Sequence, residues 1–428
     1  MTGILGIVLI VPIIAYLVFA EFISRREERR YRTDIISDLP PLSSNASSDS
    51  SAQTTAARPN EVSWKANEVS WKGWRDMVVD AIQDESPDCR SFSLRPVDGE
   101  RLPRFRGGQS IGVRCKPSDD ADAPKPVVRC YSLSSGPGEP RYRITVKRVP
   151  DGRMSRQLHD TIQAGDVIQI QAPRGHFHID PDYPERPLHL IAAGIGITPM
   201  LSMLLQSIEE TPNREVHLYY QLRDQTNAPF LKPLRYLDNT LANTGTFKLH
   251  VWLSRPIEDI DSQTDSTVGQ ATTGRISAAQ IIQRTGNDEG DYRICGPNAF
   301  MESMATELIQ HGVDEASIQY ESFGGKAKGP GAIAVKNAAA GETDELKITF
   351  TQSNCDTTWN DPSVSLLDVA EDAGVNVDAS CRAGQCGSCI HRLIKGSVRY
   401  DEQPECDVEE GEVVMCVARP ETDVEIKA

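Results

Sequence analysis

Three cysteines stand close together near the end of this 428-residue chain, in the stretch CRAGQCGSC from Cys381 to Cys389. The residues between them are mostly small, which lets the backbone curl closely around whatever the thiols hold. Thiols at such close spacing bind zinc, form disulfides or ligate an iron–sulfur cluster. Each alternative requires a tight loop around a metal or a crosslink, so the cysteines restrict the local fold more than any other feature.

The N-terminal segment bears on the redox state of those thiols. No charged residue occurs from Gly3 to Ala20, and the apolar stretch extends to Ile23. At about 1.5 Å per residue, a helix of this length covers a hydrocarbon core of about 30 Å. A cleaved signal peptide carries basic residues before its apolar run, whereas here the arginines follow it, from Arg25 to Arg32. The positive-inside rule therefore predicts a single-pass membrane anchor over residues 3–23, with the N-terminus outside and the later domains in the cytoplasm.

A cytoplasmic location makes a disulfide framework unexpected for the 10 cysteines of the chain. Zinc and an iron–sulfur cluster then remain as explanations of the cysteine cluster.

The charge of the chain is negative and unevenly distributed. The formal net charge is −16, and residues 341–428 contribute −12 of it through 19 acidic and 7 basic side chains. Binding to nucleic acid phosphates requires clustered Lys and Arg, so a nucleic acid partner is not expected. The hydrophobic content of 39% is typical of folded domains, and the length predicts two to four of them.

Changes in composition and periodicity predict the domain boundaries. Residues 24–70 are rich in Ser, Pro, Ala and Thr and are predicted to form a flexible linker. At its end the hexamer NEVSWK occurs twice, in residues 60–65 and 67–72, which fits either a membrane-surface contact through Trp64 and Trp71 or a duplicated piece of linker.

The remaining chain is predicted to form three folded domains. Residues 71–180 alternate short apolar runs with Gly, Pro and Asp turns, which predicts an antiparallel β-barrel. In residues 181–325 strands alternate with helical patterns, which predicts an α/β domain with a parallel sheet. The Gly/Ala/Lys-rich residues 326–344 indicate a second linker, and residues 345–428 have the size of one small domain.

The cysteine spacing separates the zinc and iron–sulfur alternatives. Zinc sites usually pair two C-x2-C knuckles, and here one knuckle lacks a matching second pair. The spacing C-x4-C-x2-C is that of plant-type [2Fe–2S] sites. Together with VSLLDVAEDAGVNVDAS before the cysteines and LIKGSV after them, it resembles a plant-type ferredoxin over nearly the whole C-terminal segment. The resemblance implies an α+β, β-grasp fold and four cluster ligands: Cys381, Cys386, Cys389 and Cys416.

Two motifs in the barrel segment point to a flavin. RCYSLSS begins at Arg129 and GRMSRQLHD begins at Gly152, and in this order they resemble the flavin site of the ferredoxin–NADP reductase superfamily. The resemblance is greatest to the reductase part of flavohaemoglobins, which implies FAD as the cofactor. It implies that Arg129 neutralises a flavin phosphate, that Tyr131 packs on the isoalloxazine ring and that Ser132 hydrogen-bonds near its reactive nitrogen. Contacts to the pyrophosphate at a helix start are implied for Gly152, Met154 and Ser155.

A glycine turn in the α/β segment indicates a nucleotide site. AAGIGITPM follows a buried strand and opens a helix, so Gly194 and Gly196 allow close approach of a cofactor to the backbone. Thr198 and Pro199 begin the helix, whose N–H groups face a phosphate. The turn matches the pyridine-nucleotide turn of the same superfamily.

Two later motifs complete the implied site. ICGP supplies Cys295, Gly296 and Pro297, and the resemblance places this cysteine beside the nicotinamide ring, although a buried structural cysteine is the alternative. YESFGG supplies Glu321 and Phe323 near the flavin, so Ser132, Cys295 and Glu321 form the predicted catalytic set. Three further residues are candidates for the adenosine end, with an ordinary surface loop as the alternative: Arg223, Ser254 and Arg255.

The order of these domains predicts an oxidoreductase that carries electrons from NADH or NADPH to FAD, then to the [2Fe–2S] cluster and then to a separate redox protein. Similar reductases serve oxygenases, desaturases and the hybrid-cluster protein. Two alternatives remain: a respiratory subunit resembling the sodium-pumping NADH:quinone reductase, whose ferredoxin domain precedes its flavin domain, and a membrane-tethered redox sensor.

Overall fold

The computed structural model describes the chain from residue 71 onward. Described are residues 71, 73–115, 127–179, 184–257, 271–285, 290–323 and 345–428, the last range without residues 363, 378, 380, 381, 383, 385, 386, 401, 402, 405 and 407. Every described residue belongs to one compact unit, Asn67–Ala428. The predicted anchor over residues 3–23 and both predicted linkers lie outside the described residues. Within the described ranges, no helix is long and apolar enough to cross a membrane.

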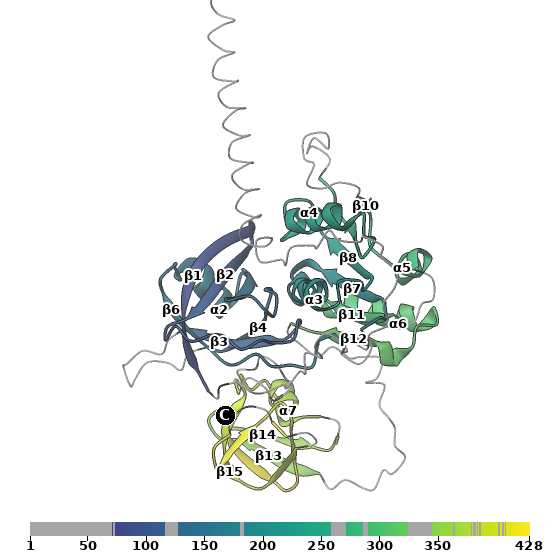
Figure 1. Cartoon of the computed structure of the whole chain (residues 1–428). Helices are drawn as coiled ribbons and strands as arrows, with labels where there is room; N and C mark the ends of the chain where they lie inside the picture. Colours follow the sequence, from purple (N-terminus) through teal and green to yellow (C-terminus); the bar gives the residue numbers. More distant parts are fainter. Residues whose placement is uncertain are drawn as a thin grey trace, which may run out of the picture. The chain divides into compact units, whose positions relative to one another are not determined.

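The first domain is an antiparallel β-barrel, on the left in Figure 1. Its strands pair in the order β4-β3-β6-β1-β2-β5, and a β-bridge from Leu133, just after β4, to Ile144 of β5 closes the circle. Alternate residues such as Met77, Phe92 and Leu94 are fully buried, because side chains of a strand point alternately inward and outward. The elements are β1 (Arg75–Ser86), β2 (Cys89–Pro96), β3 (Ser110–Cys115), β4 (Arg129–Ser132), β5 (Tyr142–Lys147), α2 (Arg153–Asp160) and β6 (Val167–Ile170).

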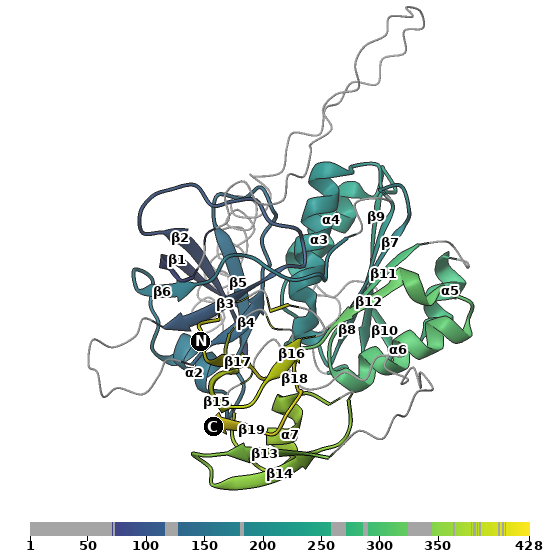
Figure 2. The same ribbon diagram turned by 90° about the horizontal axis from the view of Figure 1, so that it is seen from below.

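The second domain is a parallel six-stranded sheet in the order β10-β9-β8-β7-β11-β12. Helices cover both of its faces, α3 and α4 on one side and α5 and α6 on the other (Figure 2). The central strand β7 is buried at all six positions, as expected for a strand between two helical layers. The elements are β7 (Leu188–Ala193), η2 (Gly194–Gly196), α3 (Ile197–Glu210), β8 (Val216–Leu222), α4 (Leu231–Leu241), β9 (Phe247–Leu253), β10 (Ala271–Thr273), α5 (Ala278–Thr285), β11 (Asp291–Cys295), α6 (Asn298–Gln310), η3 (Glu315–Ser317) and β12 (Ile318–Glu321).

The strand order of this sheet reverses between β7 and β11. From β7 the chain proceeds to β8, β9 and β10 on one side, and then returns to β11 and β12 on the other. In open parallel sheets, ligands bind beyond the carboxyl ends of the strands at such a reversal point. The turn after β7 begins at Gly194 and the turn after β11 begins at Gly296, so both nucleotide motifs predicted from the sequence lie at this point.

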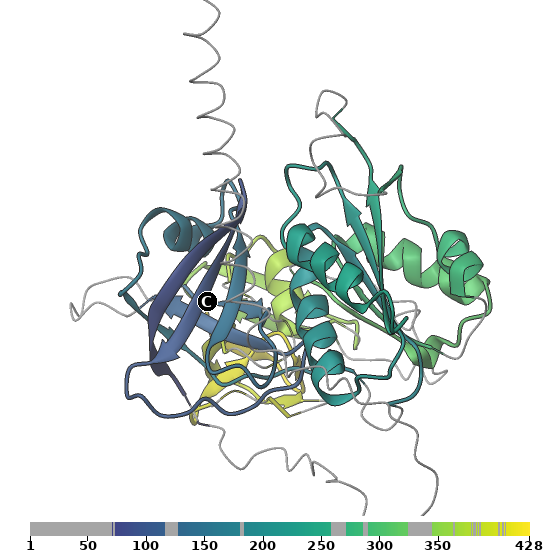
Figure 3. The same ribbon diagram turned by 45° about the horizontal axis from the view of Figure 1, so that its top comes forward.

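Hydrogen bonds join the barrel to the nucleotide domain. The hydroxyl of Ser202 on α3 donates to the carbonyl of Ser135 at 2.7 Å, and the amide of Gly107 donates to Oε1 of Gln206 on the same helix at 2.7 Å. Arg293 on β11 donates to the carbonyl of His178 at 2.8 Å. Figure 3 shows the barrel beside the parallel sheet with its flanking helices. These contacts fix the barrel relative to the carboxyl edge of the sheet.

The third domain has a five-stranded sheet in the order β14-β13-β19-β15-β17 and a two-stranded sheet of β16 and β18. Helix α7 begins at a capping box, in which Ser365 and Asp368 bond each other's backbone amides. The apolar side of this helix, with Leu366 and Leu367, belongs to the core of the domain. The elements are β13 (Leu346–Phe350), β14 (Cys355–Trp359), α7 (Leu366–Asp372), β15 (Ile390–Lys395), β16 (Val398–Tyr400), β17 (Glu412–Val414), β18 (Ala418–Pro420) and β19 (Val424–Lys427).

Candidate active site and cluster site

The flavin motif after residue 128 forms strand β4. Arg129 and Tyr131 are partly buried, whereas Ser132 is 4% exposed. Burial raises the pKa of the Tyr131 phenol, so this side chain stays neutral and presents an aromatic face. The hydroxyl of Ser132 donates to Oε2 of Glu321 at 3.2 Å, which joins the barrel to the last strand of the nucleotide domain. The structure therefore brings together two residues that are far apart in sequence and that the sequence predicted at one site.

The second flavin motif starts helix α2. Gly152 is its N-cap, with an extended backbone, and Met154 is buried below it. The hydroxyl of Ser155 accepts from the amide of Val149 at 3.2 Å and donates to the carbonyl of Gly152 at 3.4 Å. Ser155 thus holds the turn that presents the first amides of the helix, a suitable partner for a phosphate.

Glycine is required at two positions of the nucleotide turn for two different physical reasons. Gly194 has a φ of +55°, a conformation that favours glycine. At Gly196 a Cβ atom would come within 2.2 Å of the carbonyl oxygen of Cys295, because the turn after β7 lies directly against the end of β11. Thr198 and Pro199 follow in the first turn of α3, as predicted, and both are buried. The two nucleotide motifs are therefore packed against each other.

Cys295 is the last residue of β11 and is fully buried. Burial raises the pKa of its thiol well above the ordinary value, and Glu321, its register partner on β12, adds to the effect. Gly296 and Pro297 follow as the turn and the N-cap of α6. The thiol is neutral and is not among the residues that line the cavity described next.

The carboxyl group of Glu321 has an unusual environment. Desolvation by the surrounding protein raises its pKa to about 7, and the hydrogen bond from Ser132 opposes part of this shift. A carboxyl with a pKa near neutrality changes charge at the pH at which an enzyme works. This group is therefore the strongest candidate for a functional titratable residue in the described part of the chain.

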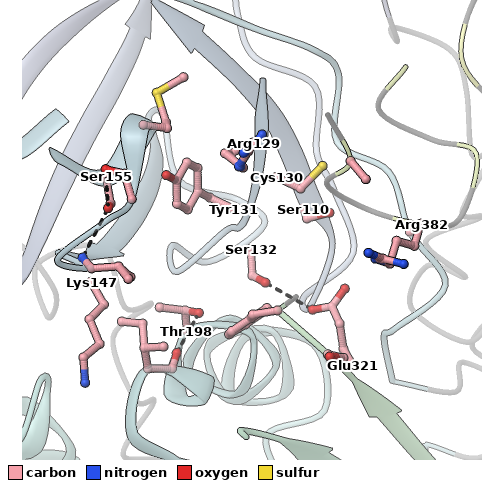
Figure 4. A pocket seen from close by; sticks show the side chains of 18 of the residues that line it. Ser110, Arg129, Cys130, Tyr131, Ser132, Lys147, Ser155, Thr198, Glu321 and Arg382 are labelled. Atoms are coloured by element: carbon pink, nitrogen blue, oxygen red, sulfur yellow. Dashed lines mark hydrogen bonds between the residues drawn. The ribbon is translucent and has the colours of Figure 1, made fainter. Parts of the chain in front are cut away.

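A cavity of about 900 Å³ opens in front of these residues (Figure 4). Predicted residues that line it are Arg129, Tyr131, Ser132, Gly152, Met154, Ser155, Thr198, Glu321, Phe323 and Cys416. Predicted residues outside its lining are Gly194, Gly196, Pro199, Cys295, Gly296 and Pro297. Basic side chains, a helix start and an aromatic face suit a phosphate-bearing aromatic cofactor, and the volume is in the usual range for such sites.

The two predicted cluster ligands that lie within the described residues are buried in the third domain. Cys389 is 2% exposed and Cys416 is 8% exposed, and the amide of Gly384 donates to the sulfur of Cys416 at 3.3 Å. Such N–H bonds to thiolate sulfur are a known feature of iron–sulfur sites. The other two predicted ligands, Cys381 and Cys386, lie outside the described residues, so the described ranges contain no complete group of metal ligands. Buried thiols with a loop amide directed at sulfur fit a [2Fe–2S] cluster.

Several residues of the cavity were not predicted from the sequence. Ser110 of β3 and Lys147 of β5 line it from the barrel, and Arg382 lines it from the cysteine loop. Lys147 and Ser110 lie outside the motifs, and Arg382 is a spacer residue of the cysteine motif, so tertiary pairing rather than local spacing places each of them at the cavity. Arg223 and Arg255, suggested for the adenosine end, are exposed beyond β8 and β9, and the amide of Arg255 donates to the carbonyl of Arg223 at 2.7 Å.

Family models match all three domains. The oxidoreductase FAD-binding domain matches residues 76–179, the oxidoreductase NAD-binding domain matches residues 190–306, and the 2Fe-2S iron-sulfur cluster binding domain matches residues 348–421. These assignments confirm FAD, a [2Fe–2S] cluster and NADH or NADPH as the cofactors and substrate expected from the motifs. The barrel, the parallel-sheet domain and the ferredoxin domain are likewise confirmed.

The FAD- and NAD-binding domains of this chain are also similar to those of individual known proteins. Flavohemoprotein B of Dictyostelium discoideum is 32% identical over 265 residues, which are 59% of this chain and 60% of that protein. The chain thus spans about three-fifths of the length of the curated relatives it matches. The FAD/NAD-binding domain of the Vibrio cholerae nitric oxide dioxygenase is 32% identical, with a TM-score of 0.50, and the match covers 59% of this chain and 99% of that one.

A third comparison includes the ferredoxin domain. An intact type IV self-sufficient cytochrome P450 monooxygenase matches over 83% of this chain and 41% of its own, at 20% identity and a TM-score of 0.51, and so shares the fold. The fold and site define an NAD(P)H-dependent oxidoreductase with a flavin and an iron–sulfur cluster. The chain belongs to the ferredoxin–NADP reductase superfamily, with a flavohaemoglobin-like FAD/NAD module followed by a plant-type [2Fe–2S] ferredoxin domain.

Proposed function

We propose that this protein is a membrane-anchored reductase that passes electrons from NAD(P)H through FAD and the [2Fe–2S] cluster to a separate redox protein. An oxygenase, a desaturase or a hybrid-cluster-type protein would be its acceptor. The observation that carries the proposal is the shared cavity. Ser132 and Glu321 line one part of it, and the cluster ligand Cys416 lines another, so one space adjoins both redox centres.

The side chains around the cavity have separate tasks. Arg129, Lys147 and the first turn of α2 would hold the phosphates of the dinucleotide. Tyr131 would pack against an aromatic ring, and the paired glycine turns would let the nucleotide approach the sheet edge. Bound FAD supplies the conversion of a two-electron hydride into single electrons, and the cluster carries one electron at a time.

Glu321 would control the charge beside the flavin. The hydrogen bond from Ser132 Oγ fixes Oε2 of the carboxyl group, and a pKa near 7 lets the same group hold a proton or release it. When protonated, the group is neutral and does not oppose arrival of the negative charge that accompanies the hydride. The carboxylate form opposes it, so flavin reduction should become easier as the pH falls through 7.

The charge of the ferredoxin domain favours a basic acceptor. Residues 341–428 carry a net charge of −12, and complementary charge accelerates encounter between proteins at low salt. Cytochrome c, a basic protein, serves as a probe of this surface, and ferricyanide as a small probe of the flavin.

The test compares the two probes in the wild type and in Cys416→Ser. The proposal predicts that the variant loses cytochrome c reduction and keeps ferricyanide reduction, and that the wild-type cytochrome c rate falls as salt rises. Equal cytochrome c rates in both proteins would show that electrons leave from the flavin and would refute the proposed path.

The membrane anchor is supported by the uncharged stretch from Gly3 to Ala20 and by the arginines that follow it. Expression of the full chain and of a chain beginning at Trp74 tests it directly. The full chain should stay with membranes after alkaline carbonate extraction, with its domains protected from protease outside the cell, whereas the shorter chain should not sediment. Release of the full chain by carbonate would exclude a spanning helix.

A further inference from the structure

We infer that Arg382, with its two carboxylate partners on helix α7, is a positioning residue that sets how readily the cluster accepts an electron. Arg382 directly follows Cys381, the first predicted ligand, in the cysteine loop. Its guanidinium forms an ion pair with Glu371, and its Nη1 lies 3.7 Å from Oδ1 of Asp368. These three side chains, here called the Arg382 triad, carry a formal charge of −1.

The backbone at this position supports a functional role for the side chain. Arg382 has a φ of +54°, a conformation that disfavours every residue with a Cβ atom. Glycine would fit this position with less strain, as it does at the nearby Gly384 and Gly387, which have φ values of +69° and +71°. The loop therefore tolerates strain at the one position where the chain places a guanidinium, and the ion pairs with α7 offset that strain.

The Arg382 triad is connected to the cluster ligands by hydrogen bonds. In the first turn of α7 the amide of Leu367 donates to the carbonyl of Met415, whose own amide donates to the carbonyl of Cys389. Asp368 is held in the capping box with Ser365, so its carboxylate cannot move freely away from Arg382. A fixed charge acts more strongly on a nearby redox centre than a mobile one, because less of its field is lost to reorganisation.

The same side chain lies on the route between the two redox centres. Arg382 and Asp368 line the cavity together with Glu321 and Cys416. Figure 4 shows the guanidinium of Arg382 directed into the cavity, on the side of Glu321. One electron entering the cluster adds one negative charge beside the triad. The guanidinium stabilises that added charge, and the two carboxylates oppose it.

This assignment predicts that substituting the two partners of one ion pair has opposite effects on the stability of the reduced cluster. Arg382→Gln changes the formal charge of the triad from −1 to −2, so the reduced cluster becomes less stable. Glu371→Gln changes it from −1 to 0, so the reduced cluster becomes more stable. A merely structural role predicts that both variants shift the cluster in the same direction, because each breaks the same contact.

The experiment is a dithionite titration of the full-length protein, in which the EPR signal of the reduced cluster is followed. At a fixed potential, Arg382→Gln should lower the ratio of reduced to oxidised cluster about tenfold, which corresponds to about 59 mV for a one-electron couple. Glu371→Gln should raise the ratio several-fold. Lys347→Gln, which removes a cation from the exposed pair with Asp356 elsewhere in the domain, is the matched control and should shift nothing.

Shifts in the same direction, or no shift in Arg382→Gln, would overturn the assignment. If Arg382→Gln does not retain a cluster, Glu371→Gln decides alone: a raised ratio supports the assignment, and an unchanged or lowered ratio refutes it. The inference rests on the proposed path through the cluster. Failure of NAD(P)H to reduce the wild-type cluster would refute that path, whereas normal wild-type reduction with unshifted variants would refute only the role of Arg382.

Discussion

Two regions of this protein are built in different ways: the surroundings of Glu321, here called the hydride end, and the surroundings of the predicted cluster ligands, here called the cluster end. At the hydride end, Ser132, Cys295 and Glu321 stand at the ends of strands of two sheets, and the key carboxyl has a pKa moved to about 7 by burial. At the cluster end, the ligands lie in and after a loop with positive φ angles, inside a strongly acidic domain. We expect hydride transfer to depend on a titratable group in a fixed position. We expect single-electron transfer to depend on the charges that surround the acceptor.

The largest effect is expected at the cluster end. Cys416→Ser should remove the [2Fe–2S] cluster, because Cys416 is a predicted ligand that is buried and whose sulfur accepts a hydrogen bond from Gly384. Iron content and the EPR signal measure the loss. Bleaching of the flavin by NAD(P)H should persist in this variant, and its disappearance would show that the two ends are not separable.

The next effect is expected at the hydride end. Glu321→Gln should abolish the pH dependence of flavin reduction near 7 and should keep the faster, low-pH rate at high pH, because the amide is neutral, like the protonated carboxyl group, and does not titrate. Ser132→Ala should have a smaller effect, since it removes one hydrogen bond to the carboxyl group. Stopped-flow absorbance from pH 5.5 to 8.5 measures both, and an unchanged inflection in Glu321→Gln would assign the pKa to another group.

Two ion pairs differ in burial, and we expect them to contribute differently to the stability of their domains. Arg214 and Asp291 of the nucleotide domain lie 2.6 Å apart and are almost fully buried, whereas Lys347 and Asp356 of the ferredoxin domain lie 2.7 Å apart and are more than half exposed. Arg214→Ala should cost about 3–5 kcal/mol, because it leaves a buried carboxylate without its partner. Lys347→Ala should leave the melting of its domain unchanged. Similar losses in both domains would contradict the role given to burial.

The smallest effect concerns acid stability of the nucleotide domain. His217 bonds His250 at 3.2 Å and Glu215 at 2.9 Å, and burial lowers the pKa of both histidines, that of His250 to about 3. Between pH 6.5 and 3 the unfolded chain therefore binds more protons than the folded chain. Stability therefore falls as the pH falls through this range, by up to about 1.4 kcal/mol per pH unit for His250, and the lowered pKa of His217 acts in the same direction.

Hydrogen exchange of the amides of β8 and β9 at pH 7 and pH 5 measures this loss. His250→Gln should reduce the pH dependence, and His311→Gln, at the exposed end of α6, should not. An equal pH dependence in all three proteins would exclude the buried histidines as its cause.

Much of this architecture was predictable from local patterns. Local sequence patterns predict the alternation in β1, β2 and β5, the buried run of β7 and the glycine turn before α3. Each of these elements depends on backbone requirements of residues that are close in sequence. Ser132 and Glu321 were predicted at one site only through the family resemblance, and their 3.2 Å contact depends on the packing of two domains. Spacing alone does not contain such information.

Other features had no local signal at all. The placement of Lys147 and Arg382 at the cavity follows from tertiary pairing, and the raised pKa of Glu321 follows from burial by distant segments. Cys295 was expected beside the nicotinamide, which stays a prediction; the structure shows that its side chain is fully buried and that its carbonyl oxygen lies against Gly196. The membrane anchor and the linkers stay predictions, since they lie outside the described residues.

The most direct test of the central claim is the order of electron arrival. Wild-type protein is mixed anaerobically with NADH and, separately, with NADPH, and flavin absorbance and the EPR signal of rapidly frozen samples are followed together. The account predicts that flavin bleaching precedes the cluster signal and that each reduced cluster appears at the expense of reduced flavin. A cluster signal that rises before the flavin bleaches, or with no flavin bleaching by either nucleotide, would contradict it.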